Sequence, residues 1–293
     1  MLDEVVAEYR DGAPESGSSG RFSLAGAQPK IALHRLPDGT WGVPEDATPT
    51  THILKPVVGT FRRIDVVEQV TLRAARVLGN EVADSQVVRI GSWDVLVSEQ
   101  YDRRVDGGLW RRLHQEDMCQ ALSVPPQKKY QHRDGGTGVA HVSALLRSLP
   151  LPGDRVAAGR AFFRAFVFNV VAGCTDAHAK NYSLLLDGRS VRLAPLYDLL
   201  SFAAYWDGES RIDSAMSVDG EYSLHRISES SLARLGPRFG LDAEESASIV
   251  HLVRRDVLGA FEAARDSVTG HGTDALSTAD DLLVGLRRLP LVG

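Results

Sequence analysis

The chain has 293 residues, of which 43% are hydrophobic, so it is long enough for one large domain or for two lobes with a filled core. A formal net charge of -5 argues against a protein that works mainly by coating nucleic acid. Two distant cysteines, Cys119 and Cys174, indicate neither a disulfide framework nor a thiolate zinc site. The N-terminal stretch lacks signal-peptide order and no apolar run reaches the roughly 20 residues that span a bilayer, so we expect a cytoplasmic protein without a membrane span.

A tract of Gly, Ser and Pro precedes the first patterned segment and predicts a flexible leader over residues 1–20. Apolar and polar residues then alternate around a Pro-Asp-Gly turn at 37–39, which is typical of a β-hairpin. The stretch "THILKP" predicts a short strand that stops at Pro56. The first ordered segments are therefore expected to be strands.

Apolar residues recur at helical spacing over 62–78 and Gly79 follows as a stop, which predicts one amphipathic helix. The stretch "DSQVVRIGSWDVLVSEQYDRR" predicts two strands joined by a tight Gly-Ser turn. We therefore predict an α+β fold whose first part, over 21–103, is a small β-rich N-lobe with one helix.

Beyond residue 110 the pattern becomes helical, in "QEDMCQAL", "GVAHVSALLRSL" and the strongly apolar "GRAFFRAFVFNVVAGC". The stretch "YSLLLDGRSVRLAPLYDLLS" predicts a hairpin around Asp187-Gly188, and the rest reads as helical. Asp242 is expected to cap a helix, with Glu245 as its return partner. Residues 104–293 are thus predicted to form a larger, mostly helical C-lobe that carries a catalytic loop and a metal-binding hairpin.

The stretch "TDAHAKNYSLLL" contains Asp176 and Asn181 at the spacing of a kinase catalytic loop, in which the Asp accepts a hydroxyl proton and the Asn holds a magnesium ion. The predicted hairpin folds its two ends together, so Asn181 and Asp198 are expected to lie side by side as hard oxygen ligands for Mg²⁺ on nucleotide phosphates. The alternative is that Asp176 caps a turn and Asn181 satisfies a loop backbone.

A phosphoryl-transfer site also needs a cation on the phosphates, and Lys55 interrupts an otherwise apolar strand with Glu68 in the helix that follows. The alternative is a snorkelling lysine and a solvated glutamate. Glu99, Gln100 and Tyr101 leave a strand between the lobes and could offer backbone groups to an adenine edge. No Gly-rich phosphate motif is present, and the small residues of "SLAGAQPK" over 23–30 are the one candidate for a phosphate loop.

Several of these motifs together resemble a known family. The stretches "FSLAGAQPKIAL", "THILKP", "LVSEQYDRR", "QEDMCQAL" followed by "KKY" and "DGG", "GCTDAHAKNYS" and "LAPLYDLLS" occur in the order found in HipA-family serine/threonine kinases, the toxins of HipBA-type toxin–antitoxin modules. The resemblance runs from about 21 to about 201. It implies a two-lobed, protein-kinase-like (HipA-like) fold and an ATP- and Mg²⁺-dependent protein serine/threonine kinase.

The resemblance also implies roles for single residues. Asp176 would be the proton acceptor, Asn181 and Asp198 would hold the metal, and Ser23 would be phosphorylated by the enzyme itself, which ejects the phosphate loop and inactivates the kinase. A phosphoserine carries roughly two negative charges and could not share a pocket with ATP phosphates. The implied ATP-binding residues are Ala25, Gly26, Ala27, Gln28, Pro29, Lys30, Lys55, Glu99, Gln100, Tyr101, His178, Ala179, Lys180, Asn181, Tyr197 and Asp198.

The resemblance implies partners as well. Family members phosphorylate aminoacyl-tRNA synthetases and are held by a helix-turn-helix antitoxin of the HipB type, so DNA would be reached only through the antitoxin. The longer toxins carry an extra N-terminal subdomain, and the length of this chain resembles the short HipT-type toxins, in which a separate small protein, HipS, supplies it. We therefore expect a HipB-type antitoxin and a HipS-type protein as partners.

Two other functions fit parts of the sequence. A catalytically weak kinase-like protein could serve as co-repressor beside a DNA-binding antitoxin, but it would not need intact Asp176, Asn181 and Asp198. A metal-dependent phosphoesterase could use the same residues with His178, but it would need further His or carboxylate ligands. Labelled ATP separates the three, because only a kinase transfers the label to protein.

Overall fold

The computed structural model describes residues 29–45, 48–58 and 60–292. The predicted leader over 1–20, the predicted modification site Ser23 and the predicted phosphate-loop residues 25–28 lie outside these ranges. None of the helices within the described ranges combines the length and apolar character that a membrane crossing requires.

The N-terminal part is a five-stranded antiparallel sheet in the order β2-β1-β3-β5-β4. Its strands are β1 (Ile31–Arg35), β2 (Trp41–Gly42), β3 (His52–Pro56), β4 (Ser85–Ile90) and β5 (Trp93–Glu99). Both predicted turns are confirmed, since Arg35 pairs with Trp41 and Ile90 with Trp93. Strand β3 lies in the middle of the sheet, bonded to β1 and β5, so Lys55 stands on a strand that cannot shift in register without disturbing two neighbours.

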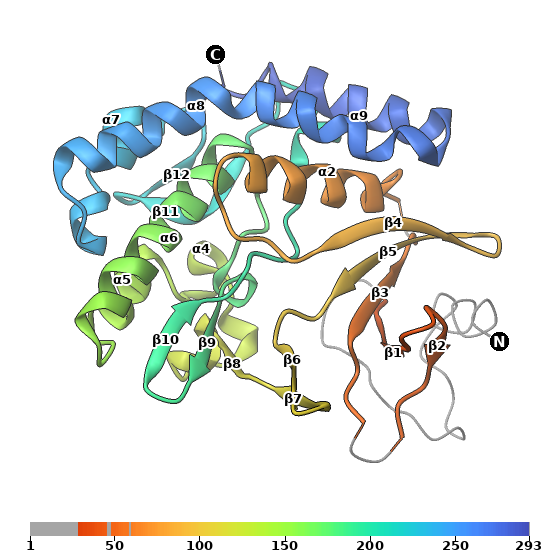
Figure 1. The fold of residues 1–293 in the computed structure, drawn as a ribbon. Helices are drawn as coiled ribbons and strands as arrows, with labels where there is room; N and C mark the ends of the chain where they lie inside the picture. The colour runs from red at the N-terminus through yellow and green to blue at the C-terminus, as the bar shows by residue number, and fades with distance from the viewer. Residues whose placement is uncertain (1–28, 46–47, 59, 293) are drawn as a thin grey trace.

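The predicted helix is α2 (Ile64–Val77), and it packs on more than one side. It contacts β4 and β5 of the sheet, and it also contacts α8 (Ala243–Arg265) and α9 (Thr273–Leu286), which lie above it in Figure 1. For this reason even its polar residues Asp65, Glu68 and Gln69 are buried. The sequence predicted an amphipathic helix with one polar, exposed face. In the structure, much of that polar face is buried as well.

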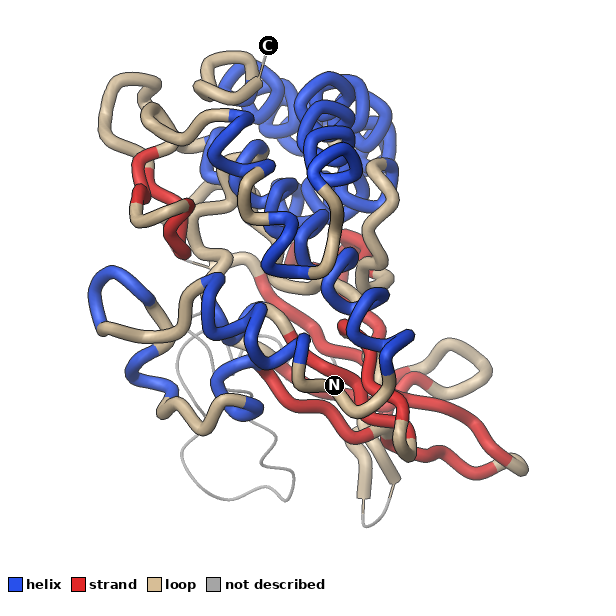
Figure 2. The backbone as a smooth tube through the Cα atoms, turned by 90° about the vertical axis from the view of Figure 1, so that its left-hand side faces the viewer, coloured by secondary structure: helices blue, strands red, loops and turns tan. Residues whose placement is uncertain are grey.

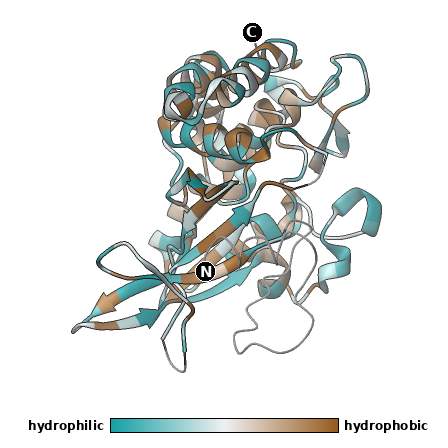
Figure 3. Ribbon diagram, turned by 90° about the vertical axis from the view of Figure 1, so that its right-hand side faces the viewer, coloured by the Kyte–Doolittle hydropathy of each residue, from teal (hydrophilic) through white to brown (hydrophobic). Residues whose placement is uncertain are grey.

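The C-terminal part is mostly helical, and Figure 2 shows helices at the top of the view and the strands of the sheet at the lower right, with further short helices at the lower left. Its helices alternate between hydrophilic and hydrophobic residues, as Figure 3 shows. Besides α8 and α9 it contains α3 (Met118–Ala121), α4 (Gln131–Asp134), α5 (Val139–Arg147), α6 (Pro152–Val171) and α7 (Glu229–Ala233), and the 3-10 helices η1 (Pro126–Lys128), η2 (Ala179–Asn181), η3 (Phe202–Ala204), η4 (Gly236–Phe239) and η5 (Asp266–His271).

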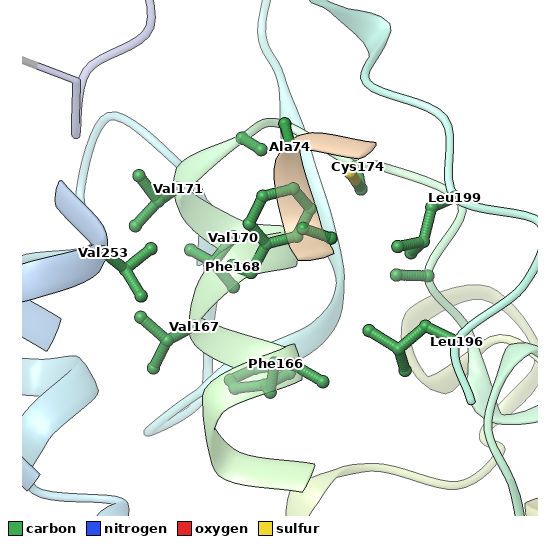
Figure 4. Close-up of a cluster of buried hydrophobic side chains, with 14 of the residues drawn as sticks. Ala74, Phe166, Val167, Phe168, Val170, Val171, Cys174, Leu196, Leu199 and Val253 are labelled. Atoms are coloured by element: carbon green, nitrogen blue, oxygen red, sulfur yellow. The ribbon is translucent and has the colours of Figure 1, made fainter. Parts of the chain in front are cut away.

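Helix α6 is the core helix that its apolar sequence predicted. Phe166, Val167 and Phe168 are at most 2% exposed. Figure 4 shows them clustered with Ala74 of α2 and Val253 of α8. The helix ends just before the segment of Asp176, so that segment starts from the most deeply packed element of the chain.

The predicted hairpin after this segment is also present. It consists of β9 (Ser183–Asp187) and β10 (Ser190–Leu193), with Asp187 paired to Ser190 across the predicted turn. The second strand ends at Leu193, so Asp198 belongs to the loop that follows and not to the strand end. Strand β8 (His114–Asp117) joins the hairpin to make a three-stranded sheet.

Three predictions in this part were wrong. Residues 115–117 were expected in a helix and form the end of β8, because they pair with β9, a partner distant in sequence. Two short ribbons were not predicted as strands: β6 (Arg103–Asp106) with β7 (Leu109–Arg112), and β11 (Asp213–Val218) with β12 (Glu221–Ser223). The first is largely exposed and has no buried apolar face, while β11 buries Met216 and Val218 in the core although its short sequence was expected to be helical. Asp242 caps α8 as predicted, by accepting from the Glu245 amide at 2.7 Å, but the Glu245 carboxylate instead pairs with Arg160 at 2.5 Å.

Candidate functional site

Lys55 is a buried cation on the central strand of the sheet, and its side chain is 5% exposed. Its ammonium nitrogen lies 2.5 Å from the Oε1 atom of Glu68 on α2 and also forms an ion pair with the carboxylate of Asp198. Neither a snorkelling lysine nor a solvated glutamate describes this pair. Strand β3, helix α2 and the distant loop of Asp198 therefore meet at one ammonium group.

Asp198 has a backbone φ of 51°, in the left-handed region that non-glycine residues seldom adopt. Its Oδ2 atom accepts from the Lys30 ammonium at 3.0 Å, while Oδ1 accepts from Lys55. Burial would raise the pKa of Asp198, but the two ammonium groups outweigh burial and hold it well below its usual range. The carboxylate is thus ionised and bound by two cations.

The same balance applies to Lys55. Burial lowers the pKa of its ammonium group, yet the carboxylates of Asp198 and Glu68 more than offset burial and raise that pKa above its ordinary value. Lys55 therefore stays charged in the folded protein, as a group that is to bind phosphate must.

The predicted phosphate loop is described only at its end, at Pro29 and Lys30. Both residues precede β1 and are partly buried. Because the Lys30 ammonium contacts Asp198, this end of the predicted loop lies beside Lys55. The sequence placed Lys30 among the phosphate-binding residues but did not indicate its contact with Asp198.

Asp176 lies in the loop between α6 and η2, and its side chain is 60% exposed. Its main-chain oxygen accepts from the Asn181 side-chain amide at 2.8 Å, which closes the segment on itself. Its carboxylate accepts a hydrogen bond from the phenol of Tyr130. The sequence pointed to no role for Tyr130, although the "KKY" stretch that contains it was among the motifs of the resemblance.

His178 and Ala179 are buried, and Lys180 is partly buried. The Nε2 atom of His178 lies 4.0 Å from the Asp176 carboxylate, and its Nδ1 atom has no hydrogen-bond partner among the described residues. Burial lowers the pKa of His178 although Asp176 opposes this, so its ring is neutral. Lys180, predicted to line the nucleotide site, pairs with Asp117 at 2.6 Å, and Asp117 caps α3.

Tyr197 fixes the segment of Asp198 to the segment of Asn181. Its phenol donates to the Lys180 carbonyl at 2.8 Å, and since a phenol has one proton, Ser183 donates to it at 2.6 Å. The ring lies 6.0 Å from that of Tyr101, at an interplanar angle of 31°. The two predicted site tyrosines are thus neighbours across the predicted boundary between the lobes.

The predicted hinge residues differ in what they can offer a ligand. The Glu99 amide donates to the Asp84 carbonyl and the Gln100 amide to the Thr51 carbonyl, each at 2.8 Å. Within the described ranges, Tyr101 is the one of the three whose amide is not already committed to another residue. An adenine edge would therefore find its donor at Tyr101.

The predicted magnesium ligands are Asn181 and Asp198, and each has a partner of its own. The Asn181 nitrogen is turned to Asp176, which directs its amide oxygen away from that bond, and both Asp198 oxygens accept from lysines. The described residues contain no group of three or more His, Cys, Asp or Glu side chains that could hold a metal. Two oxygen donors fit a magnesium ion that takes its other ligands from nucleotide phosphates and water.

One cavity lies away from these residues. Its volume is about 270 Å³, and it is lined by Gln131, Val139, Ala140, Ser217, Asp219, Gly220, Leu235 and Arg238. It contains none of the predicted site residues, but it borders the segment that carries Tyr130.

Comparison with known proteins shows which family this chain belongs to. The chain is 34% identical to the protein Y4mE of Sinorhizobium fredii, over 98% of this chain and 66% of that protein. It is 33% identical to the serine/threonine-protein kinase toxin HipA of Shewanella oneidensis, over 80% of this chain and 54% of that protein. The chain spans about half to two thirds of the length of the curated relatives that it matches.

A solved structure agrees with these relatives. The complex of HipA, HipB and operator DNA from Shewanella oneidensis MR-1 contains a chain that matches with a TM-score of 0.79 and 27% identity, over 99% of this chain and 71% of that one. The match confirms the predicted α+β, HipA-like fold with a β-rich and a mostly helical lobe. Residues 22–261 match the family described as the HipA-like C-terminal domain. The chain therefore belongs to the family of HipA-like C-terminal domains.

Proposed function

We propose that this chain is an ATP- and Mg²⁺-dependent protein serine/threonine kinase. The observation that supports it most is the placement of Lys55 between Glu68 and Asp198, with the Asp176 segment held to the same region through Tyr197. Protein kinases use a strand lysine paired with a helix glutamate, and an aspartate that holds magnesium, to bind and neutralise the phosphates. The names of the relatives point to the same activity.

The charges suggest how the chain's residues would act. Lys55 and Lys30 would face the phosphates, with the carboxylates of Glu68 and Asp198 fixing Lys55 in place. Asp176 would accept the proton of the substrate hydroxyl. At the same time the hydroxyl oxygen would bond to the γ-phosphorus of ATP, and the bond from that phosphorus to the ADP oxygen would break. Asn181 and Asp198 would hold a magnesium ion, whose positive charge would offset the negative charge of the phosphate oxygens.

The wider role that we propose is that of a toxin in a toxin–antitoxin module, which halts translation by phosphorylating an aminoacyl-tRNA synthetase in the cytoplasm. Autophosphorylation at Ser23 would then end the activity, because the new charge would repel bound phosphates. A HipB-type antitoxin is proposed as partner because the solved relative is a complex with HipB and operator DNA. A HipS-type small protein is proposed as the second partner because the motifs of this chain resemble those of the short HipT-type toxins, which act with such a protein.

The test of the activity is phosphate transfer from γ-labelled ATP with Mg²⁺, using the wild type, Asp176→Gln and the control Asp256→Gln, whose side chain on α8 is 44% exposed. We expect the wild type and the control to label protein, and Asp176→Gln to lose at least a hundredfold in rate, as expected when a general base is removed. Label transfer by Asp176→Gln at the wild-type rate would refute the role of the base. A wild type that labels nothing would favour the co-repressor alternative, and phosphate release without labelled protein would favour a phosphoesterase.

A further inference from the structure

The phenol of Tyr130 is the side-chain donor that the described residues provide for the Asp176 carboxylate. That carboxylate is 60% exposed, so without such a bond it could rotate among several orientations. We propose that Tyr130 is a positioning residue for the acceptor side of the site, which holds the Asp176 carboxylate in the orientation that receives the substrate hydroxyl. This inference rests on the proposed kinase function.

The segment that carries Tyr130 is folded as a rigid turn. The Tyr130 carbonyl accepts from the Asp134 amide at 3.2 Å and from the Gly136 amide at 3.1 Å. A side chain at Gly136 would place its Cβ 1.8 Å from the Lys128 carbonyl oxygen, so only glycine allows this closure. The "KKY" and "DGG" stretches are thus the two ends of one compact loop. The closure of this loop holds the backbone of Tyr130 in place.

A second set of contacts fastens this loop to the C-terminal part. The Gln131 side chain accepts from the Ser217 amide at 2.9 Å and donates to the Ser217 hydroxyl at 3.1 Å, on strand β11. A Cβ atom at Gly138 would lie 2.3 Å from the Gln131 side chain, so the glycine makes room for this clamp. The position of the Tyr130 backbone therefore depends on contacts with β11. It does not depend on the lysines and carboxylates that we assign to ATP binding.

Three side chains also pack against the ring of Tyr130. It meets the buried ring of His178 edge-on, with centroids 4.8 Å apart and an interplanar angle of 80°. The Lys129 ammonium lies 4.9 Å and the Arg133 guanidinium 4.4 Å from the ring centroid. Two cations and an imidazole edge leave the ring few other positions, so the phenol is presented to Asp176 in one place.

The direction of the bond supports a positioning role. Burial and then the Asp176 carboxylate raise the pKa of Tyr130, so its phenol keeps its proton and donates. The bond uses Oδ1 of Asp176, which leaves Oδ2 for the acceptor hydroxyl. Anchoring one oxygen before the substrate arrives removes rotational freedom that the transition state would otherwise have to remove.

The experiment compares Tyr130→Phe with a matched control, Tyr205→Phe. The first change removes the bond to Asp176 and keeps the ring, while the second removes a phenol that donates to the Arg62 carbonyl at 3.0 Å, away from Asp176. The probe is γ-labelled ATP with Mg²⁺ and a mixed library of serine and threonine peptides. We expect kcat of Tyr130→Phe to fall about tenfold with both KM values unchanged, since misorientation of a catalytic group acts on the chemical step. Tyr205→Phe should match the wild type.

Three results would overturn the inference. An unchanged kcat would mean that the bond orients nothing, and a higher kcat would mean that the phenol obstructs the acceptor. A rise in the KM for ATP that accompanies the loss of kcat, together with a lower melting temperature, would mean that the change is structural. If the wild type transfers label and Tyr130→Phe equals it, the inference alone fails. If the wild type transfers none, the proposed function fails and takes the inference with it.

Discussion

Lys55 is a charged residue in a place that a charge cannot occupy alone. Removing water from an ammonium group costs several kcal/mol, and the neighbouring carboxylates of Glu68 and Asp198 offset this cost. The arrangement adds little net stability, but it holds Lys55, Glu68 and Asp198 at fixed places. A site that must receive phosphates benefits from groups that are positioned before the ligand binds.

Replacing Lys55 by methionine should therefore affect both stability and binding. Glu68 would keep a buried carboxylate and lose the one cation in contact with it among the described residues, so we expect the free energy of unfolding to fall by about 3 kcal/mol. The exposed residue Lys128 provides the control Lys128→Met, which should change it by less than about 0.5 kcal/mol. Urea denaturation measures both. If Lys55→Met is as stable as Lys128→Met, the ion pairs of Lys55 do not offset the cost of its burial. In a separate measurement, titration calorimetry should show that Lys55→Met no longer binds ATP.

Among the elements, α6 shows how closely the C-terminal part is packed. A Cβ atom at Gly159 would lie 2.3 Å from the Phe239 carbonyl oxygen, so the helix and η4 approach each other at a point where only glycine fits. At Gly153, in the same helix, nothing lies within 4 Å of such an atom. The two glycines look alike in sequence, and only their surroundings separate them.

Alanine at these two positions should have opposite effects. Gly159→Ala pushes against backbone and should lower the free energy of unfolding by about 2 kcal/mol or more, as overpacking does. Gly153→Ala should leave it unchanged or raise it by up to about 0.5 kcal/mol, because alanine favours the helix. Chemical denaturation of both variants tests the packing, and equal effects would contradict it.

For the whole molecule, α2 is the element that joins the two parts. Its residues Val66, Val70 and Ala74 belong to the same buried cluster as Phe166 and Phe168 of α6. A second, smaller cluster consists of residues of the sheet only, including Leu33, Leu54 and Val97. The sheet thus has a minor core of its own and shares the major one through α2.

We therefore expect the two parts to unfold together. Separating them would expose α2 along α8 and α9, and the small cluster of the sheet could not offset that loss of buried apolar surface. Differential scanning calorimetry should show one transition, with equal calorimetric and van't Hoff enthalpies. Two resolved transitions would mean that the shared core does not couple the parts.

By itself, the sequence determined the elements whose signals are local. The turns at Pro37-Asp38-Gly39 and Asp187-Gly188, the helix that ends before Gly79 and the apolar core helix were all predictable, because turn residues and apolar periodicity act over a few neighbours. The kinase spacing of Asp176 and Asn181 was visible for the same reason. Strand β8 was not, since its partner β9 lies far along the chain.

Only the tertiary structure decided which polar groups meet. It brought Lys30 to Asp198, turned Lys180 to Asp117 and set Tyr130 against Asp176, contacts between residues that are between 46 and 168 positions apart. No local pattern encodes such pairs, because they depend on how the sheet, α2 and α6 pack. Packing also made Lys55 a buried cation between two carboxylates, which the pattern of its strand left open.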